Sequence, residues 1–144
     1  MNKNEELVRN VFKVWETGNT EEIEQYTDSN FMEHTPDPAF KSDKKGIEYV
    51  KDLISTYREA FSNLKVDIKQ VITNENKAVV YSTFKGKHTG MLNDIPPTNK
   101  EVSFDNIDIM EINNGKISGH WGIADNLNLM MQIGVLTEAE LHPH

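Results

Sequence analysis

The sequence predicts an α+β fold in which a curved antiparallel β-sheet, cone-shaped overall, is covered on one face by N-terminal helices. Apolar residues recur at helical spacing near the N-terminus and over residues 46–61, then alternate with polar residues from residue 64 onward. An Asn-Asn-Gly turn signal separates the last two predicted strands. With 144 residues, the chain has the length of one domain, and we expect residues 1–144 to share a single core.

The first part of the chain is predicted to be mostly helical. The first predicted helix has apolar residues at helical spacing: Leu7, Val8, Val11, Phe12 and Trp15. Gly18 is a typical helix stop, and Thr20 is a suitable N-cap for a short helix over residues 20–26. A brief strand is expected at residues 30–34. Residues 35–45 carry two prolines and no periodicity, so we expect a loop there that lies over an opening.

The second half of the chain is predicted to supply the sheet. Residues 64–73 and 77–88 read as a hairpin, and residues 101–112 read as a long strand. Along the long strand the apolar residues move from even to odd positions. This change predicts a bulge or sharp bend near Asp105 and Asn106.

The chain is expected to end with one more strand and a helix. The "NNGK" turn leads into a strand over residues 116–123. Asp125 opens and Gly134 closes a short helix. Residues 135–144 are predicted to form a loosely held tail.

Composition excludes several classes of function. The net charge of −8 disfavours binding to nucleic acid, whose affinity depends on basic side chains. No stretch approaches the roughly 20 apolar residues of a membrane span, and no apolar signal segment opens the chain, so we expect a cytoplasmic protein without membrane contact. The absence of cysteine rules out disulfides and thiol chemistry.

A bent sheet wrapped around a long helix leaves a cavity at its open end, which predicts a pocket for a small, mostly apolar ligand. His120 lies within a strand built for burial, and an imidazole with a pKa near 6.5 suits proton transfer. Asp108 on the neighbouring strand is expected to face the same cavity. The two residues are therefore the predicted catalytic pair, although a structural ion pair explains them equally well.

Further residues are predicted to contact the ligand. His34 and His88 end predicted strands at the pocket rim, where a hydrogen bond to a loop is the alternative role. Asp125 has the competing role of helix N-cap. No histidines have metal-pair spacing, so no metal site is expected. The full set of predicted substrate-binding residues is Trp15, Phe31, His34, His88, Met110, Gly122, Asp125 and Met131.

Several stretches carry a family resemblance. They include "LVRNVFKVWETGNTEEIEQY", "NFMEHTP", "GIEYVKDLISTYREAFSNLKV", "GKHTGMLNDIPPTNKEVSF" and "NNGKISGHWGIADNLNLMMQIG". Through them the sequence resembles the SnoaL-like polyketide cyclases, also called ester cyclases, of the nuclear-transport-factor-like superfamily. The resemblance implies a cone-shaped, cystatin-like α+β barrel, a homodimer that pairs through the sheet face away from the pocket, and ring closure without metal or organic cofactor.

The resemblance also carries over to single positions. The acid/base aspartate of the cyclases falls on Gly122, and a pocket histidine falls on Asp108. The histidine next to the catalytic position matches His120, and a pocket aromatic matches Trp15. Two functions therefore follow as alternatives: an acid/base enzyme that uses Asp108 and His120 on a carbonyl compound, such as a cyclase or isomerase, or a non-catalytic protein that binds a small molecule in the same pocket.

Overall fold

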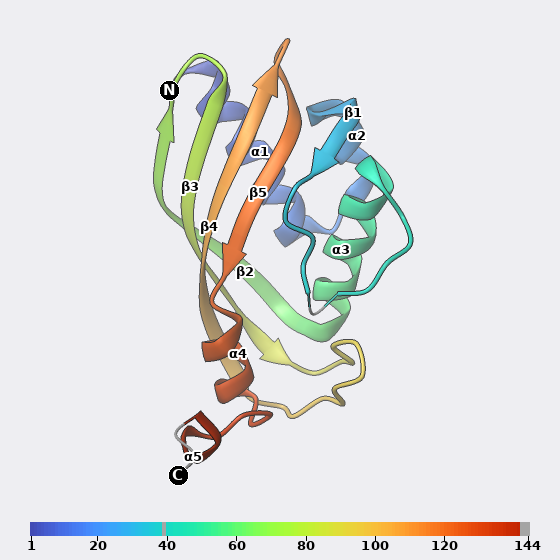
Figure 1. The fold of residues 1–144 in the computed structure, drawn as a ribbon, viewed down its shortest axis with the longest axis vertical. Coiled ribbons are helices and arrows are strands. Elements are labelled where there is room, and N and C mark those ends of the chain that lie inside the picture. The colour runs from blue at the N-terminus through green and yellow to red at the C-terminus, as the bar shows by residue number, and fades with distance from the viewer. Residues whose placement is uncertain (39, 142–144) are drawn as a thin grey trace.

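The structure, a computed structural model, describes residues 1–38 and 40–141 (Figure 1). Its elements, in chain order, are α1 (Lys3–Thr17), η1 (Thr20–Glu22), α2 (Ile23–Tyr26), β1 (Thr27–Glu33), α3 (Gly46–Ala60), β2 (Phe61–Thr73), β3 (Lys77–His88), β4 (Glu101–Asn113), β5 (Lys116–Ala124), α4 (Asn126–Gln132) and α5 (Glu138–Leu141). The predicted sequence of helices, strands and a closing helix is confirmed.

The strands form one curved, unclosed sheet in the order β1-β5-β4-β3-β2. The predicted antiparallel pairing is confirmed for β2 to β5. In contrast, β1 pairs in parallel with β5, with Glu33 opposite His120. This parallel pairing brings a segment from the N-terminal half of the chain against the last strand.

The bulge predicted near Asp105 and Asn106 is wrong. The pairing of β3 with β4 runs without a register shift through both residues, and even-numbered residues of β4 face inward along its whole length. Ile107 and Ile109 instead point outward and are 45% and 37% exposed. The bulges of the antiparallel strands occur elsewhere, within β2 and near Glu111 of β4.

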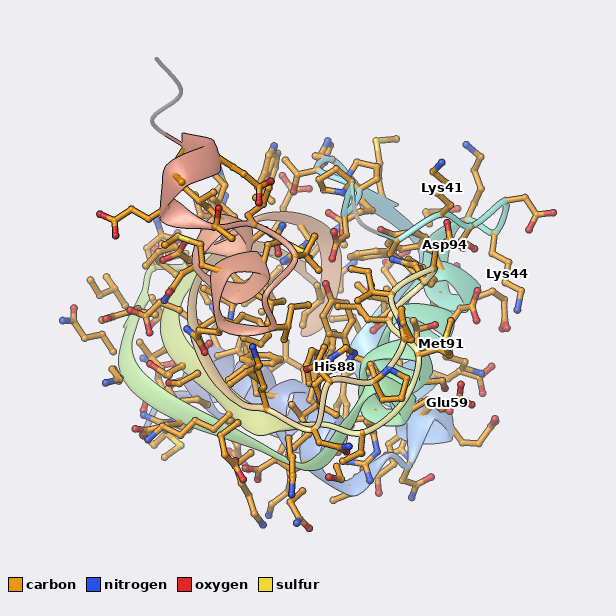
Figure 2. The ribbon with its side chains drawn as sticks, turned by 90° about the horizontal axis from the view of Figure 1, so that it is seen from below. Lys41, Lys44, Glu59, His88, Met91 and Asp94 are labelled. Carbon is orange, nitrogen blue, oxygen red and sulfur yellow. The ribbon has the colours of Figure 1, made fainter. Side chains whose placement is uncertain are left out.

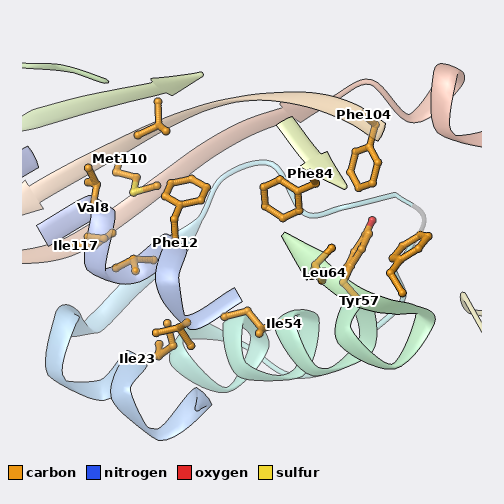
Figure 3. Close-up of a cluster of buried hydrophobic side chains, with 14 of the residues drawn as sticks. Val8, Phe12, Ile23, Ile54, Tyr57, Leu64, Phe84, Phe104, Met110 and Ile117 are labelled. Carbon is orange, nitrogen blue, oxygen red and sulfur yellow. The ribbon is translucent and has the colours of Figure 1, made fainter. Parts of the chain in front are cut away.

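The core lies between the inner face of the sheet and the helices α1 and α3 (Figure 3). Phe12 of α1 packs edge-to-face on Phe84 of β3, and Phe84 contacts Phe104 of β4. Ile54 and Tyr57 of α3 are also buried in this cluster. Aromatic side chains bury large apolar areas, so these contacts stabilise the bend of the sheet around the helices.

The predicted end of α1 is confirmed, but Thr20 is not an N-cap: it is the first residue of η1, whose N-cap Asn19 makes no side-chain cap hydrogen bond. Gly18 adopts φ 77° at the C-cap of α1, and its N–H donates to the carbonyl of Val14. The tail predicted to be loose contains the short helix α5, and His142 and His144 lie outside the described residues. Within the part of the chain that is described, no helix combines the length and apolarity needed to cross a bilayer.

Candidate functional site

A cavity of about 390 Å³ lies inside the cone, between the sheet, α1, α3 and the loop that follows β1. Its walls are mostly apolar. The residues predicted from sequence that do line it are Trp15, Phe31, Asp108, Met110, His120 and Gly122. Both predicted catalytic residues therefore face the same cavity as the predicted aromatic wall.

Three ionisable side chains meet on the wall of this cavity. The Nε2 of His120 lies 2.7 Å from Oδ1 of Asp108. The Nδ1 of the same ring lies 2.7 and 2.8 Å from the two carboxylate oxygens of Glu33. An imidazole with a carboxylate at each nitrogen donates from both when it is protonated.

This arrangement favours the charged form of His120. Burial of the ring alone lowers its pKa, but the hydrogen bonds and charges of Asp108 and Glu33 together outweigh burial and raise the pKa to about 9. At neutral pH the cluster is therefore an imidazolium between two carboxylates, with a net charge of −1. A protonated His120 can donate a proton or act as a cation, whereas only the carboxylates of this cluster can accept a proton.

Gly122 has no side chain, and the cluster occupies the space that one would fill. A Cβ placed on Gly122 would lie 2.7 Å from Oδ1 of Asp108 and 2.7 Å from Cε1 of His120. Asp108 is also the direct partner of Gly122 in the pairing of β4 with β5. The absence of a side chain at residue 122 thus permits the contact between Asp108 and His120.

A second polar group lies on the α3 side of the same cavity. The hydroxyl of Tyr57 donates to Oδ2 of Asp37 at 2.5 Å, and the backbone N–H of Asp37 donates to the hydroxyl of Tyr49 at 2.9 Å. All three residues line the cavity. Nearby, the N–H of Gly122 donates to Oγ1 of Thr35 at 2.7 Å, so the loop after β1 is held against both α3 and β5.

Carboxylates outnumber cations among the residues that line the cavity. Glu33, Asp37 and Asp108 contribute carboxylates, and His120 contributes the only cation among the described residues that line it. An anionic ligand would therefore meet repulsion in a partly desolvated space. The cavity is suited to a neutral, mostly apolar molecule.

His34 lies outside the cavity, which corrects its predicted place at the rim. Side chains alternate along β1, so that Phe31 and Glu33 point inward and His34 points to the other side of the sheet. There its ring stacks on Trp121, with centroids 4.1 Å apart and an interplanar angle of 6°. Glu33, the residue next to the one predicted, holds the inward position.

His88 also lies away from the cavity, in the core at the end of β3 (Figure 2). Its Nδ1 contacts the hydroxyl of Thr98 at 3.0 Å and accepts from the N–H of Thr98. Burial lowers the pKa of His88. His88 thus does not line the cavity, and its contacts with Thr98 match the alternative role of anchoring a loop.

Two further predicted contacts are not found at the cavity. The side chain of Asp125 caps α4 by accepting from the N–H of Asn128 at 3.1 Å, as its competing role required. Met131 is 37% exposed on the outside of α4. Neither residue lines the cavity, because α4 turns away below the end of β5 (Figure 1).

Glu33, Asp37 and Tyr49 are among the polar cavity residues that sequence reasoning missed. Strand alternation from Phe31 could have placed Glu33 inside, but its partner His120 is 87 residues away. Asp37 lies in a proline loop without periodicity, so no pattern indicated its direction. Over residues 1–38 and 40–141, no group of three or more His, Asp or Glu side chains has the arrangement of a metal site.

Comparison with known proteins agrees with this architecture. Solved TsrD from Streptomyces laurentii superposes with a TM-score of 0.83 at 25% identity, covering 93% of this chain and 96% of that one. The chain is 26% identical to the aklanonic acid methyl ester cyclase of Streptomyces peucetius, over 90% of this chain and 89% of the relative. It is also 26% identical to the nogalonic acid methyl ester cyclase of Streptomyces nogalater, over 82% and 87%. The SnoaL-like polyketide cyclase family matches residues 5–133. Since this match spans most of the sequence, the chain belongs to the SnoaL-like polyketide cyclase family.

Proposed function

We propose that the protein catalyses a cofactor-independent ring closure of a neutral, mostly apolar carbonyl compound, with Asp108 as the base. The observation that carries this proposal is the contact of Asp108 with His120 on the wall of an apolar cavity, 2.7 Å between Oδ1 and Nε2. Family membership and two relatives named as methyl ester cyclases support a reaction of this type.

The cluster provides both a base and a cation at one point. Asp108 removes a proton from the carbon next to a carbonyl, and the electron pair of the C–H bond becomes an enolate. With Asp108 neutralised, the Nε2–H of the His120 cation is free to donate to the enolate oxygen. Glu33 remains on Nδ1 and keeps the ring charged and oriented.

The ring closure that follows needs no added reagent, because every bond and proton is accounted for within the substrate and Asp108. The enolate carbon attacks a second carbonyl of the same molecule, so that a C–C bond forms and the C=O π bond becomes an alkoxide. The proton held by Asp108 passes to this alkoxide. Substrate and product are therefore isomers, and the carboxylate is regenerated for the next turnover.

The charge of the cavity supports an uncharged substrate. Three carboxylates and one imidazolium disfavour a ligand that carries its own carboxylate. A methyl ester masks that charge, and it is the form named for both Streptomyces cyclases. We therefore infer an esterified substrate and selection against the free acid.

Turnover of nogalonic and aklanonic acid methyl esters tests the proposal. Wild type is expected to cyclise at least one ester, and Asp108→Asn to reduce kcat/KM by about two to four orders of magnitude. Asp105→Asn is the matched control, because Asp105 is an exposed aspartate of the same strand. The corresponding free acid should react far more slowly than its ester. Equal rates for wild type and Asp108→Asn would contradict the role of Asp108. Binding of the esters without cyclisation would contradict the proposed reaction and favour the non-catalytic alternative.

We further propose a homodimer that pairs through the outer face of the sheet. Ile72, Val79, Ile109 and Trp121 form a continuous row across four strands there. Ile72 is 62% exposed and Ile109 is 37% exposed, and apolar side chains in such a row favour burial against a second surface. A cytoplasmic location and independence from metals and organic cofactors stay predictions.

A further inference from the structure

We infer that Tyr49 is a second substrate-binding group of this site, which donates a hydrogen bond to the oxygen of the carbonyl under attack. This inference rests on the proposed ring closure. It adds a residue that stabilises, by a hydrogen bond, the negative charge formed on the oxygen of the second carbonyl. Such a donor is required because the attacked oxygen becomes an alkoxide, and an apolar wall alone would not stabilise it.

The hydrogen bonding of Tyr49 leaves its proton available. The phenol oxygen accepts from the backbone N–H of Asp37 at 2.9 Å. No hydrogen bond donated by the Tyr49 hydroxyl occurs within the described part of the chain. The side chain lines the cavity although the residue is only 5% exposed, so its O–H is available to an acceptor on a bound ligand.

The position of the Tyr49 side chain is fixed by its contacts with neighbouring residues. Asp37 also accepts a hydrogen bond from the hydroxyl of Tyr57 at 2.5 Å. Tyr57 belongs to α3, as Tyr49 does. The ring of Tyr49 also packs against Phe40, with centroids 5.6 Å apart. A donor held in this way needs little reorganisation when charge develops on the substrate. Asp37 and Tyr57 are therefore positioning residues for Tyr49.

Electrostatics keep Tyr49 in its donor form. Burial is the main cause that raises the pKa of Tyr49, and the charges of Glu33 and Asp37 raise it further. The hydroxyl therefore stays protonated around neutrality. The influence of Glu33 also shows that Tyr49 lies within electrostatic reach of the cluster around His120.

The pair of Asp108 and His120 acts at one end of the reaction, and Tyr49 acts at the other. Asp108 and His120 act on the carbon that loses its proton and on the enolate oxygen. Tyr49 hydrogen-bonds the second carbonyl oxygen while the C–C bond forms, without giving up its own proton. The alkoxide finally receives the proton that Asp108 removed, so atoms and charges balance as in the proposed reaction.

Binding of a carbonyl probe tests this role apart from turnover. The probes are 2-acetylnaphthalene and its isostere 2-isopropenylnaphthalene, which differ only in C=O against C=CH₂. Wild type is expected to prefer the ketone about fivefold or more and to shift its carbonyl stretch to lower wavenumber on binding. Tyr49→Phe retains the ring against Phe40 and should abolish both the preference and the shift. Tyr81→Phe is the matched control, because its hydroxyl contacts Asp105 outside the cavity.

Turnover separates this inference from the proposed function. Tyr49→Phe should lower kcat for the methyl esters by about 10²-fold, within the range for loss of one such donor, and Tyr81→Phe should not. A Tyr49→Phe variant that keeps the ketone preference and the carbonyl shift would overturn the inference. If Asp108→Asn stops turnover while Tyr49→Phe leaves kcat unchanged, the proposed function stands and the role of Tyr49 is wrong. If no variant differs from wild type in turnover, the proposed function fails, and the ketone preference alone decides for or against Tyr49.

Discussion

Asp108 and Gly122 lie directly opposite each other in β4 and β5, and Oδ1 of Asp108 lies 2.7 Å from the position that a Cβ of Gly122 would take. In this chain the carboxylate comes from β4, and the imidazole that contacts it is His120 of β5. The contact therefore joins a carboxylate of one strand to an imidazole of the next, across the position that has no side chain.

Replacing Gly122 with alanine is expected to separate Asp108 from His120. The new methyl group would occupy space within 3 Å of both side chains, so they must move apart. We expect kcat/KM to fall by about 10- to 100-fold, within the usual worth of a positioned acid/base group. Gly119→Ala is the control, because the nearest atoms to its added Cβ, in Glu111 and His34, lie 3.2 and 3.3 Å away, against 2.7 Å at Gly122. Equal activity in both variants would show that the contact with His120 is not needed.

The protonation of His120 predicts how stability depends on pH. Its pKa is raised from 6.5 to about 9 in the folded protein. The resulting stabilisation is complete below pH 6.5 and is lost as the pH rises through about 9; it amounts to roughly 3 kcal/mol. Urea unfolding of wild type and His120→Gln at pH 6 and pH 10 measures it, since glutamine cannot titrate. The difference in unfolding free energy between the two proteins should shrink at pH 10, and a constant difference would contradict a charged His120.

Glu33 is expected to control the pKa of His120. Glu33→Gln keeps an oxygen that accepts from Nδ1 but removes one of the two negative charges beside the ring. The pKa of His120, followed by NMR titration of its ring signals, should fall below about 9 toward its ordinary value. Glu111→Gln serves as the control, because Glu111 contacts Ser118 and not His120. An unchanged titration in Glu33→Gln would remove Glu33 from the site.

A charge in the outer row of the sheet is expected to dissociate the proposed homodimer. Ile109→Lys places a cation in the middle of the apolar row that includes Val79 and Trp121, where burial of an unpaired charge is costly. Sedimentation equilibrium should give twice the chain mass of 16.5 kDa for wild type and the single mass for the variant. Val135→Lys, an exposed site beyond α4, should leave the mass unchanged. A wild-type protein with the single mass at micromolar concentration would contradict the dimer.

Local patterns predicted the elements well because their causes are local. Gly18 ends α1 and Asp125 caps α4, and both roles depend only on a few neighbouring residues. The error on β4 arose from the assumption that apolar residues face the core. Ile107 and Ile109 face outward, and their parity was interpreted as a bulge. The sequence could not show that the second face of the sheet is apolar too.

The candidate site was predicted in part, for a physical reason. Asp108 and His120 lie on neighbouring strands joined by a short turn, so alternation within one hairpin sufficed to place them together. Glu33 reaches His120 only through the parallel pairing of β1 with β5, which no local pattern specifies. Asp37 and Tyr49 meet because a proline loop folds onto α3, and that path depends on tertiary contacts.

The parallel pairing of β1 with β5 also has a consequence during synthesis of the chain. Glu33 and Asp108 leave the ribosome before His120, so an incomplete chain carries both acids without the ring that neutralises them. The pairing of β1 with β5 therefore requires that β5 has been synthesised. A pKa of about 9 for His120 thus reports that β1, β4 and β5 have come together.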